Sequence, residues 1–290
     1  MSQPVHALSA SALPTPLVSA QQLVAARAGG LAPVIIDCSF DLADTDAGQR
    51  AFAQGHVPGA TYAHLDRDLA GTKTGRNGRH PLPARADFAA TFGRLGVAPD
   101  RHVVVYDAQG GMYAARAWWM LQWVGHRAVS VLDGGLQAWK DARGGIETGA
   151  PPAADGPPYP IGDSLVHTVD AATLAASLGR VALLDARAGE RFRGEVEPLD
   201  ARAGHIPGAR SRFFKDNLDA TGRFRSAAEL RSAFEAFGAV PAQVVHQCGS
   251  GVTACHNVLA MQIAGLPGSA LYPGSWSEWS SDPARPVAVG

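Results

Sequence analysis

The sequence has few cysteines, little charge and no long uninterrupted apolar run, and each shortage excludes a class of protein. Its 290 residues include three cysteines, Cys38, Cys248 and Cys255, which are too few for a secreted disulfide framework. The most apolar segment, 112–124, is interrupted by Arg116 and is too short to span a bilayer. The sequence has 25 Lys and Arg residues and 26 Asp and Glu residues, and the resulting net charge of −1 excludes a protein that binds nucleic acid through bulk positive charge.

The N-terminal segment gives no sign of a targeting signal. Residues 1–12 contain no basic cluster and no continuous apolar stretch, so we expect no signal peptide there. Together with the scarcity of cysteine, this predicts a cytoplasmic protein with no membrane partner and no nucleic-acid partner. The apolar content of 46% and the charged content of 18% are typical of a globular chain, and the length suits two domains.

What the sequence does contain is an internal repeat. Gly-His-Val-Pro-Gly-Ala at 55–60 returns as Gly-His-Ile-Pro-Gly-Ala at 204–209, and the apolar run ending in Asp at 34–37 returns at 182–185. Three further pairs keep the same order, namely 18–23 with 169–174, 103–107 with 244–248, and 132–139 with 272–279. Two copies of one domain are the simplest explanation.

A proline-rich segment divides the two copies. Residues 149–160 have no apolar period and include two Pro-Pro pairs, which is typical of a semi-rigid linker. The sequence therefore predicts an N-terminal domain over 1–148 and a C-terminal domain over 161–290.

Short apolar runs alternate with helical patterns inside each copy. The expected strands are 33–37, 102–107, 181–185 and 243–247, and the expected helices include 86–95 and 227–237, with Ser19 and Asp170 as N-caps of earlier helices. This alternation predicts an α/β fold in which each domain has a mostly parallel sheet flanked by helices on both faces. Ligands bind beyond the carboxyl ends of such strands, where Asp107 and Cys248 stand in the two copies.

The loop that begins at Cys248 is the most informative stretch. It follows an expected strand, carries Gly249 and Gly251, and leads into a helical pattern. A loop of this kind can turn its backbone N–H groups inward as an anion-binding nest, and the helix N-terminus adds partial positive charge. Such surroundings favour the thiolate form of Cys248 and make it a nucleophile. The alternative is a small buried core residue at a strand end.

The run Cys-Gly-Ser-Gly-Val-Thr-Ala-Cys at 248–255 resembles the active-site loop of the two-domain sulfurtransferases of the rhodanese superfamily. Its first six residues resemble the 3-mercaptopyruvate branch in particular. The two Gly-His-Val/Ile-Pro-Gly-Ala elements, Arg-Phe-Arg-Gly at 191–194, Asp-Gly-Gly at 133–135 and Gly-Ser-Trp at 274–276 also match the family. The resemblance implies two tandem rhodanese-like domains, of which the first is catalytically silent because Asp107 stands where the second has Cys248.

The chemistry that the resemblance implies is sulfur transfer in two steps. The Cys248 thiolate takes the sulfur of a small anionic donor, 3-mercaptopyruvate, and becomes a persulfide. A thiol acceptor, either a small thiol or a thioredoxin-like protein, or cyanide then removes that sulfur. The N–H groups of Gly249, Gly251, Val252 and Thr253 would hold the sulfur and the donor. The ten histidines do not fall at zinc-ligand spacing with any cysteine pair, so we expect no metal and no other cofactor.

The resemblance also implies side-chain roles. Arg191 matches the family's substrate arginine, whose planar fork suits a carboxylate. Ser250, His80 and Asp66 match a proton relay that would place the site between the two domains. The plainer alternatives are a solvated charge at Arg191, a loop histidine at His80 and a helix cap at Asp66.

The sequence departs from the family at one point. The mercaptopyruvate branch often has a second anion-binding arginine a few residues after Arg191, where this chain reads Glu-Val-Glu-Pro-Leu-Asp at 195–200. Arg202 is a candidate substitute. Arg187 and Arg193 are interpreted as solvated loop charges.

Three other functions stay open. A thiosulfate:cyanide sulfurtransferase would use the same nucleophile, but that branch typically has larger basic residues after the cysteine than Gly249 and Ser250. A Cys-dependent phosphatase needs an arginine six residues after Cys248, where Ala254 stands. A non-catalytic sulfur-carrier module would not need the intact cysteine loop. Four residues are expected in the core instead of the site, namely Cys38, Cys255, Trp276 and Trp279.

Overall fold

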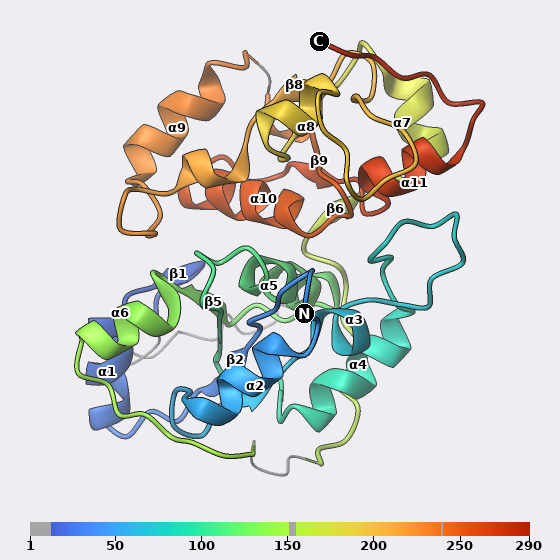
Figure 1. The fold of residues 1–290 in the computed structure, drawn as a ribbon. Coiled ribbons are helices and arrows are strands. Elements are labelled where there is room, and N and C mark those ends of the chain that lie inside the picture. The colour runs from blue at the N-terminus through green and yellow to red at the C-terminus, as the bar shows by residue number, and fades with distance from the viewer. Residues whose placement is uncertain (1–12, 151–154, 239) are drawn as a thin grey trace, which may run out of the picture.

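The chain folds into two α/β domains that lie against each other (Figure 1). The structure, a computed structural model, describes residues 13–150, 155–238 and 240–290. The first domain contains β1 (Leu17–Val18), α1 (Ala20–Ala28), β2 (Val34–Asp37), α2 (Ala47–Gln54), β3 (Thr61–Tyr62), α3 (Leu65–Asp68), α4 (Arg85–Arg94), β4 (Val103–Tyr106), α5 (Ala114–Trp123), β5 (Val129–Leu132) and α6 (Gly135–Asp141).

The second domain repeats this plan. It contains β6 (His167–Thr168), α7 (Ala171–Ser177), β7 (Ala182–Asp185), α8 (Gly189–Arg193), β8 (Arg210–Ser211), the 3-10 helix η1 (Phe214–Asn217), α9 (Ala227–Glu235), the 3-10 helix η2 (Pro241–Gln243), β9 (Val244–Gln247), α10 (Thr253–Ile263), β10 (Ala270–Leu271) and α11 (Ser275–Ser281).

The two sheets have the same topology. The strand order is β1-β5-β4-β2-β3 in the first and β6-β10-β9-β7-β8 in the second, and the paired strands in both run parallel. Asp37 is paired with Tyr106 at the end of β2 and β4, and Asp185 is paired with Gln247 at the end of β7 and β9. The internal repeat and the predicted α/β fold with parallel sheets are therefore confirmed.

Most of the predicted elements occur within two residues of their expected bounds. The four expected strands are β2, β4, β7 and β9, and the expected helices at 86–95 and 227–237 are α4 and α9. Ser19 accepts a hydrogen bond from the Gln22 N–H, and Asp170 accepts one from the Thr173 N–H, so both are the N-caps that the sequence predicts.

Each central strand sends its side chains alternately to the two faces of its sheet. In β4, Val103 and Val105 join one apolar cluster, whereas Val104 joins another on the opposite face. In β9, Val244 and Val245 divide in the same way. Because both faces are apolar, both must be covered by helices, which is the arrangement typical of parallel sheets.

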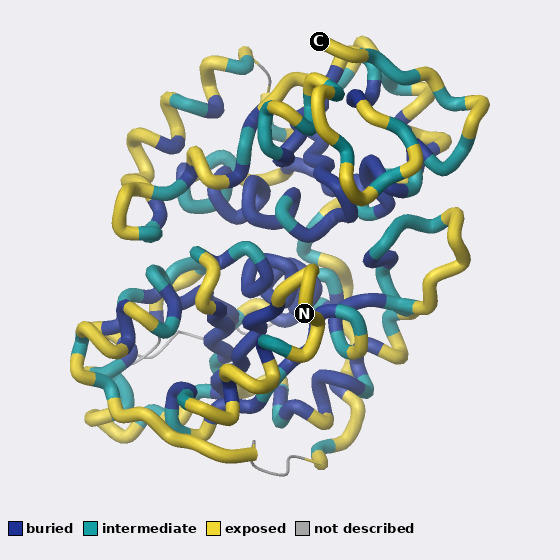
Figure 2. Tube along the Cα trace, in the orientation of Figure 1, coloured by how far each residue is buried: buried dark blue, intermediate teal, exposed yellow. Residues whose placement is uncertain are grey.

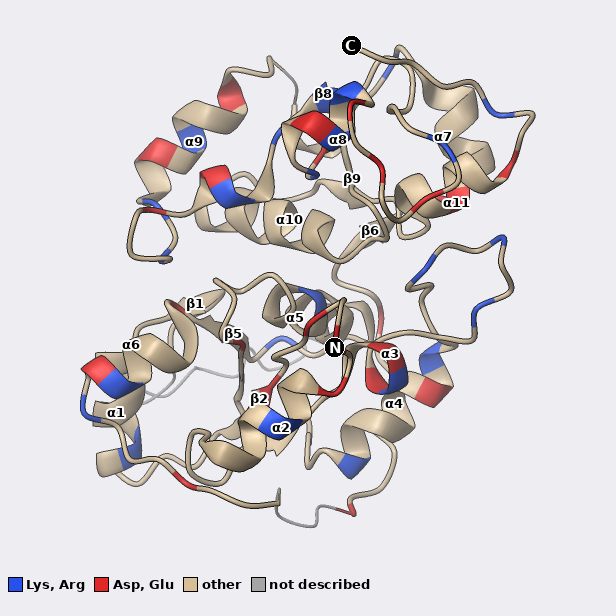
Figure 3. Cartoon of the chain, in the orientation of Figure 1, with Lys and Arg blue, Asp and Glu red and all other residues tan. Residues whose placement is uncertain are grey.

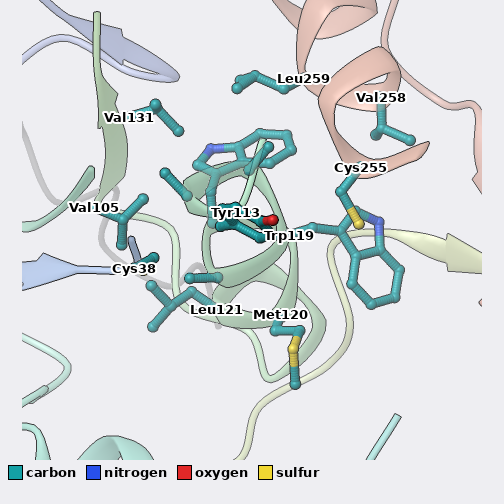
Figure 4. Packing of buried hydrophobic residues seen from close by; sticks show 14 of the residues in the cluster. Cys38, Val105, Tyr113, Trp119, Met120, Leu121, Val131, Cys255, Val258 and Leu259 are labelled. Carbon is teal, nitrogen blue, oxygen red and sulfur yellow. The ribbon is translucent and has the colours of Figure 1, made fainter. Parts of the chain in front are cut away.

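One of these clusters belongs to both domains. The inner-face helices α5 and α10 contact each other across the domain boundary, and Figure 2 shows both as buried. Figure 4 shows Tyr113 and Trp119 of the first domain close to Cys255, Val258 and Leu259 of the second. The two domains therefore share a core, and α10 is fixed against the first domain directly behind the cysteine loop.

The predicted linker continues along the first domain. The Gly156 N–H donates to the Gly93 carbonyl at 3.2 Å, and the Tyr159 N–H donates to the Ala89 carbonyl at 2.9 Å. The Gly162 N–H, just past the expected linker, still bonds to the first domain. Residues 151–154 lie outside the described residues, and the domain boundaries stay a prediction. In the part of the chain that the structure describes, no helix has the length and apolar character needed to cross a membrane.

We predict that the shared cluster makes the two domains unfold together. Leu259→Ala removes a fully buried side chain at this interface and should lower the free energy of unfolding by about 2–5 kcal/mol. Scanning calorimetry should show one transition at a lower temperature. Val240→Ala is the matched control, because Val240 is 60% exposed and its loss should cost less than about 0.5 kcal/mol. Two separate transitions, with only one shifted, would contradict the shared core.

Candidate functional site

Cys248 directly follows β9 at its carboxyl end, and the residue is 2% exposed. The Cys248 N–H donates to Ser275 Oγ at 3.1 Å, and the Cys248 carbonyl accepts from the Trp276 N–H at 2.9 Å. The Gly249 carbonyl accepts from the Ser277 N–H at 2.9 Å. The start of α11 therefore fixes the backbone on both sides of the cysteine.

A cavity of about 310 Å³ lies in front of Cys248. Both domains line it, as the relay prediction requires. Its lining residues are Leu42, Leu65, Arg79, His80, Met112 and Tyr113 from the first domain, and Ala186, Arg187, Ala188, Arg191, Leu199, Phe213, Phe214, Lys215, Cys248, Gly249, Ser250, Val252 and Thr253 from the second. A pocket of this size suits a small molecule.

The cysteine loop leaves its backbone donors available. Among the described residues, no hydrogen bond within the chain is donated by the backbone N–H groups of 249–254. The equivalent loop of the first domain shows what such a loop binds. There the Asp107 carboxylate accepts from four N–H groups at 2.8 to 2.9 Å, those of Gln109, Gly111, Tyr113 and Ala114. The first copy thus carries its own anion in the place where the second carries a thiol.

Gly251 shapes the loop without lining the cavity. Its φ of +76° lies in the left-handed region, and a Cβ atom there would lie 2.3 Å from the Pro273 carbonyl oxygen. Only glycine fits both requirements. Gly251 therefore contributes the turn, whereas Gly249, Val252 and Thr253 line the pocket itself.

Ser250, His80 and Asp66 form a chain beside the thiol. His80 Nδ1 lies 2.7 Å from Ser250 Oγ, and His80 Nε2 lies 3.4 Å from Asp66 Oδ1. Burial lowers the pKa of His80 to about 3, more strongly than the Asp66 carboxylate raises it, so the imidazole is neutral at neutral pH. Burial raises the pKa of Asp66, but the hydrogen bond from Lys73 and neighbouring positive charge bring it below its usual value.

The arginines of the cavity are held by buried carboxylates. Arg191 Nη2 donates to Glu197 Oε1 at 2.6 Å and to Asp200 Oδ2 at 3.2 Å. Arg79, from the first domain, donates to the other oxygen of Asp200. The side chains of Glu197 and Asp200 are each 3% exposed, and Figure 3 shows acidic and basic residues together around α8. Burial raises the pKa of Asp200, and the hydrogen bond from Arg79 opposes that rise.

Arg116 links the two halves of the site. Its guanidinium is fully buried in α5 and donates to the carbonyls of Gly251 at 3.1 Å, His80 at 3.1 Å and Leu69 at 3.3 Å. Burial lowers the pKa of Arg116, yet an arginine keeps its charge in proteins. One side chain of the first domain thus holds the cysteine loop and the His80 segment in a fixed relation.

One expectation about the arginines was wrong, and one open question about Arg202 now has structural evidence. Arg187 is not a solvated loop charge, because it is 3% exposed, donates to Asp185 at 2.7 Å and lines the cavity. Arg202 does not replace the second substrate arginine, because it donates to the carbonyls of Ser280 and Asp282 at the end of α11, away from the cavity lining. Arg193 is exposed and pairs with Glu195, as expected.

Sequence reasoning also missed Arg79, which lines the cavity, and three charged residues that hold the segments around it. Arg79 precedes His80 directly, and this adjacency was the available signal. Arg116 is a charged residue within the apolar segment 112–124, and this position was the signal that it is buried and has a structural role. The roles of Asp200 and Glu197 could not be predicted from the sequence, because they depend on the ion pairs that both make with Arg191 in the fold. Cys38, Cys255, Trp276 and Trp279 are all buried core residues, as expected.

The described residues contain no group of three or more His, Cys, Asp or Glu side chains that could hold a metal ion. The arrangement therefore offers a thiol, an anion-binding loop, a neutral histidine and paired arginines as its chemical groups.

The family model that matches this chain describes the rhodanese-like domain. It matches twice, over residues 19–142 and 170–282, so it covers most of both copies.

Curated relatives match nearly the full length. A probable 3-mercaptopyruvate sulfurtransferase of Pseudomonas aeruginosa is 49% identical over 94% of this chain and 98% of the relative. A putative thiosulfate sulfurtransferase, SseB, of Mycobacterium tuberculosis is 42% identical over 94% and 97%. The human 3-mercaptopyruvate sulfurtransferase is 38% identical over 94% of both chains.

Solved structures agree with these relatives. The 3-mercaptopyruvate sulfurtransferase of Leishmania major has a TM-score of 0.80 at 31% identity and covers 93% of this chain and 75% of its own. SseA of Escherichia coli, titled among 3-mercaptopyruvate sulfotransferases, has a TM-score of 0.77 at 30% identity, with 91% and 100% covered.

We predict that the cysteine loop needs glycine at 251 for two separable reasons. Gly222→Ala is the control for backbone strain alone, because Gly222 has a φ of +78° and open space around its Cβ position. This substitution should lower the free energy of unfolding by about 1–2 kcal/mol. Gly251→Ala adds the clash with Pro273 and should cost about 1–3 kcal/mol more. Urea unfolding measures both, and the alkylation rate of Cys248 by iodoacetamide should change in Gly251→Ala alone. Equal costs would mean that the loop moves freely away from Pro273.

Proposed function

The chain belongs to the family of rhodanese-like domains and is a sulfurtransferase, and we propose that its sulfur donor is 3-mercaptopyruvate. The observation that carries the proposal is that Ser250 and His80 line the same cavity as Cys248, with Asp66 behind His80. A proton route of this kind is useful for a donor that leaves as an enolate.

In the donor step, the Cys248 thiolate attacks the sulfur of 3-mercaptopyruvate. The new bond joins the two sulfur atoms, while the bond between sulfur and CH₂ breaks and leaves its electron pair on the pyruvate enolate. The proton of the donor's thiol moves to the enolate, so the products are pyruvate and the Cys248 persulfide anion. The charge and the protons balance without any external oxidant or reductant.

The proposed role of Ser250 and His80 is to carry that proton. In the neutral tautomer that carries its proton on Nε2, which lies 3.4 Å from Asp66 Oδ1, the Nδ1 atom of His80 accepts a hydrogen bond from the Ser250 hydroxyl. Ser250 can then pass a proton between the donor sulfur and the enolate carbon, while Asp66 keeps the imidazole in one tautomer. In this proposal the Asp66 carboxylate fixes the tautomer and the orientation of the His80 ring. It does not need to stabilise a charged histidine, because His80 stays neutral.

The loop and Arg191 have electrostatic roles in the proposal. The free N–H groups of 249–254 stabilise first the thiolate and then the terminal sulfur of the persulfide. The Asp107 carboxylate, bound by four N–H groups in the first copy, supports this role because it is an anion in the equivalent loop. Arg191 receives the donor carboxylate through its planar fork. The first copy lacks a nucleophile at this position and is silent.

Thiosulfate is the alternative donor, because one relative, SseB of M. tuberculosis, is named a putative thiosulfate sulfurtransferase. Its leaving group, sulfite, needs no proton, so a proton relay gives it no advantage. This difference favours 3-mercaptopyruvate over thiosulfate.

The acceptor step returns Cys248 to its thiolate. A small thiol, a thioredoxin-like protein or cyanide attacks the outer sulfur of the persulfide, and the Cys248 sulfur leaves as the thiolate. The proposed compartment is the cytoplasm, because all three cysteines are free and reducing surroundings keep thiols free.

The proposal predicts both the donor and the nucleophile. We expect kcat/KM to be at least about tenfold higher for 3-mercaptopyruvate than for thiosulfate with the same acceptor. Intact-mass measurement after donor treatment should find one added sulfur atom on the wild type and none on Cys248→Ser. A preference for thiosulfate would refute the donor, and a sulfur retained by Cys248→Ser would refute the nucleophile.

A second prediction isolates the relay. His80→Gln should slow persulfide formation from 3-mercaptopyruvate by about 10²-fold, because general acid–base catalysis typically contributes that much. The same variant should change persulfide formation from thiosulfate only a few-fold, which makes thiosulfate the internal control. Since the pKa of His80 is about 3, the wild-type rate should show no protonation of this histidine between pH 5 and 8. Equal losses with both donors would indicate a structural role only.

A further inference from the structure

The segment 71–81, between α3 and α4, forms a loop whose two ends meet. The N–H of its first residue donates to the carbonyl of its last residue at 2.8 Å, and Figure 1 shows the loop projecting toward α11. Its second limb lies against the other domain, where a Cβ atom on Gly78 would lie 2.8 Å from the Gly274 carbonyl oxygen. The loop is therefore fixed at its base and along the limb that carries His80.

Lys73 lies in a turn of this loop that one asparagine closes. The Asn77 side-chain amide donates to the Thr72 carbonyl at 3.0 Å, and the Asn77 side-chain oxygen accepts from the Thr74 N–H at 2.8 Å. The backbone is thus bound on both sides of Lys73. The Lys73 side chain is 52% exposed, but the position from which it extends is fixed.

The ammonium group of Lys73 binds the carboxylate of the proposed relay. Lys73 Nζ donates to Asp66 Oδ1 at 2.8 Å, and the same oxygen lies 3.4 Å from His80 Nε2. Within the described chain, Lys73 is the only donor of a hydrogen bond to this carboxylate. The backbone of Asp66 is fixed separately, because its N–H donates to His64 Nδ1 at 3.1 Å. Lys73 is thus the group that holds the carboxylate oxygen in its place beside His80.

The charged and titratable groups around the relay carboxylate come from few elements. Lys73 and His80 belong to the loop, and His64 stands at the start of α3 itself. Arg79 of the loop and Arg116 of α5 also act on His80. Both of these arginines hold other parts of the site, whereas Lys73 is not among the residues that line the cavity. The charge of Lys73 can therefore be removed without changing a contact to the donor.

The charge of Lys73 determines the ionisation of Asp66 at acid pH. Burial raises the pKa of Asp66, but the hydrogen bond from Lys73 opposes that rise and, with neighbouring positive charge, brings the pKa below its usual value. An ionised carboxylate is a stronger acceptor for the Nε2–H of a neutral imidazole than a protonated one. The contact with Lys73 therefore preserves the acceptor that fixes the His80 tautomer.

We propose that Lys73 is a positioning residue of the relay, which holds the Asp66 carboxylate ionised and beside His80. The inference rests on the proposed function and extends the Ser250–His80–Asp66 chain by one residue toward the solvent. Lys73 does not touch the donor and acts on the proton transfer through Asp66. Its effect should therefore appear with 3-mercaptopyruvate, whose enolate needs a proton, and be absent with thiosulfate.

The test measures persulfide formation by the wild type, Lys73→Met and Lys73→Arg from pH 4.5 to 8 with both donors. With 3-mercaptopyruvate, Lys73→Met should be no more than about threefold slower than the wild type at pH 8 and at least about threefold slower again at pH 4.5. The reason is that the lost positive charge raises the pKa of Asp66 by about one unit, so the carboxylate is protonated at a higher pH. Lys73→Arg keeps a charged donor and should restore the wild-type profile. With thiosulfate, the ratio of variant to wild-type rate should stay constant over this range.

Arg193→Met is the matched control. Arg193 also forms an exposed ion pair, with Glu195 at 2.7 Å, and it does not line the cavity. Its rate should equal the wild-type rate with both donors over the whole pH range. Exposed ion pairs contribute little to stability, so each variant should fold, which circular dichroism establishes.

Two results would overturn the inference. The first is a Lys73→Met profile with 3-mercaptopyruvate that keeps the wild-type shape. The second is the same loss at acid pH with thiosulfate, because it would place the titration at Cys248 or in the fold instead of the relay.

Failure of the proposed function can be recognised separately through His80→Gln. If His80→Gln slows both donors equally, the relay is wrong, and the role of Lys73 is wrong with it. If His80→Gln slows only the reaction of 3-mercaptopyruvate while Lys73→Met keeps the wild-type profile, the relay stands and the role of Lys73 is wrong.

Discussion

The packing of α5 against α10 is the constraint on which the site depends. These two helices bring the inner faces of both sheets into one apolar cluster, so the cysteine loop, which starts α10, faces the first domain at a fixed distance. Arg116 of α5 adds a buried charge that binds the Gly251 and His80 carbonyls at once. Without this contact, neither the proposed relay nor the paired arginines would meet Cys248.

Electrostatics then decides what each group in the cavity can do. Burial keeps His80 neutral, which suits the proton relay that we propose, and in the same proposal the backbone amides stabilise negative sulfur. The arginines are balanced by Asp185, Glu197 and Asp200, so the cavity does not hold a large excess of positive charge.

The equivalent loops of the two copies hold different groups, a carboxylate in the first and a thiol in the second. In the first copy the loop amides bind the Asp107 carboxylate, which is a permanent part of the chain and stabilises the fold. In the second copy the corresponding position is a thiol, and within the described chain the N–H groups of 249–254 have no hydrogen-bond acceptor. The first domain also contributes Arg79 and His80 to the cavity, so the copy without the cysteine is still part of its lining.

The sequence by itself determined the repeat, the parallel α/β fold, the strand positions and the cysteine loop, because hydrophobic period and glycine placement are local signals. It also pointed to Ser250, His80 and Asp66, though only through resemblance. The tertiary structure decided which charges are buried. It brought Arg79 and Arg187 into the cavity and kept Arg202 away, since ion pairing depends on segments as distant as residues 79 and 200 in the chain. Such pairings leave no local pattern, because they arise only when the two domains close on their common core.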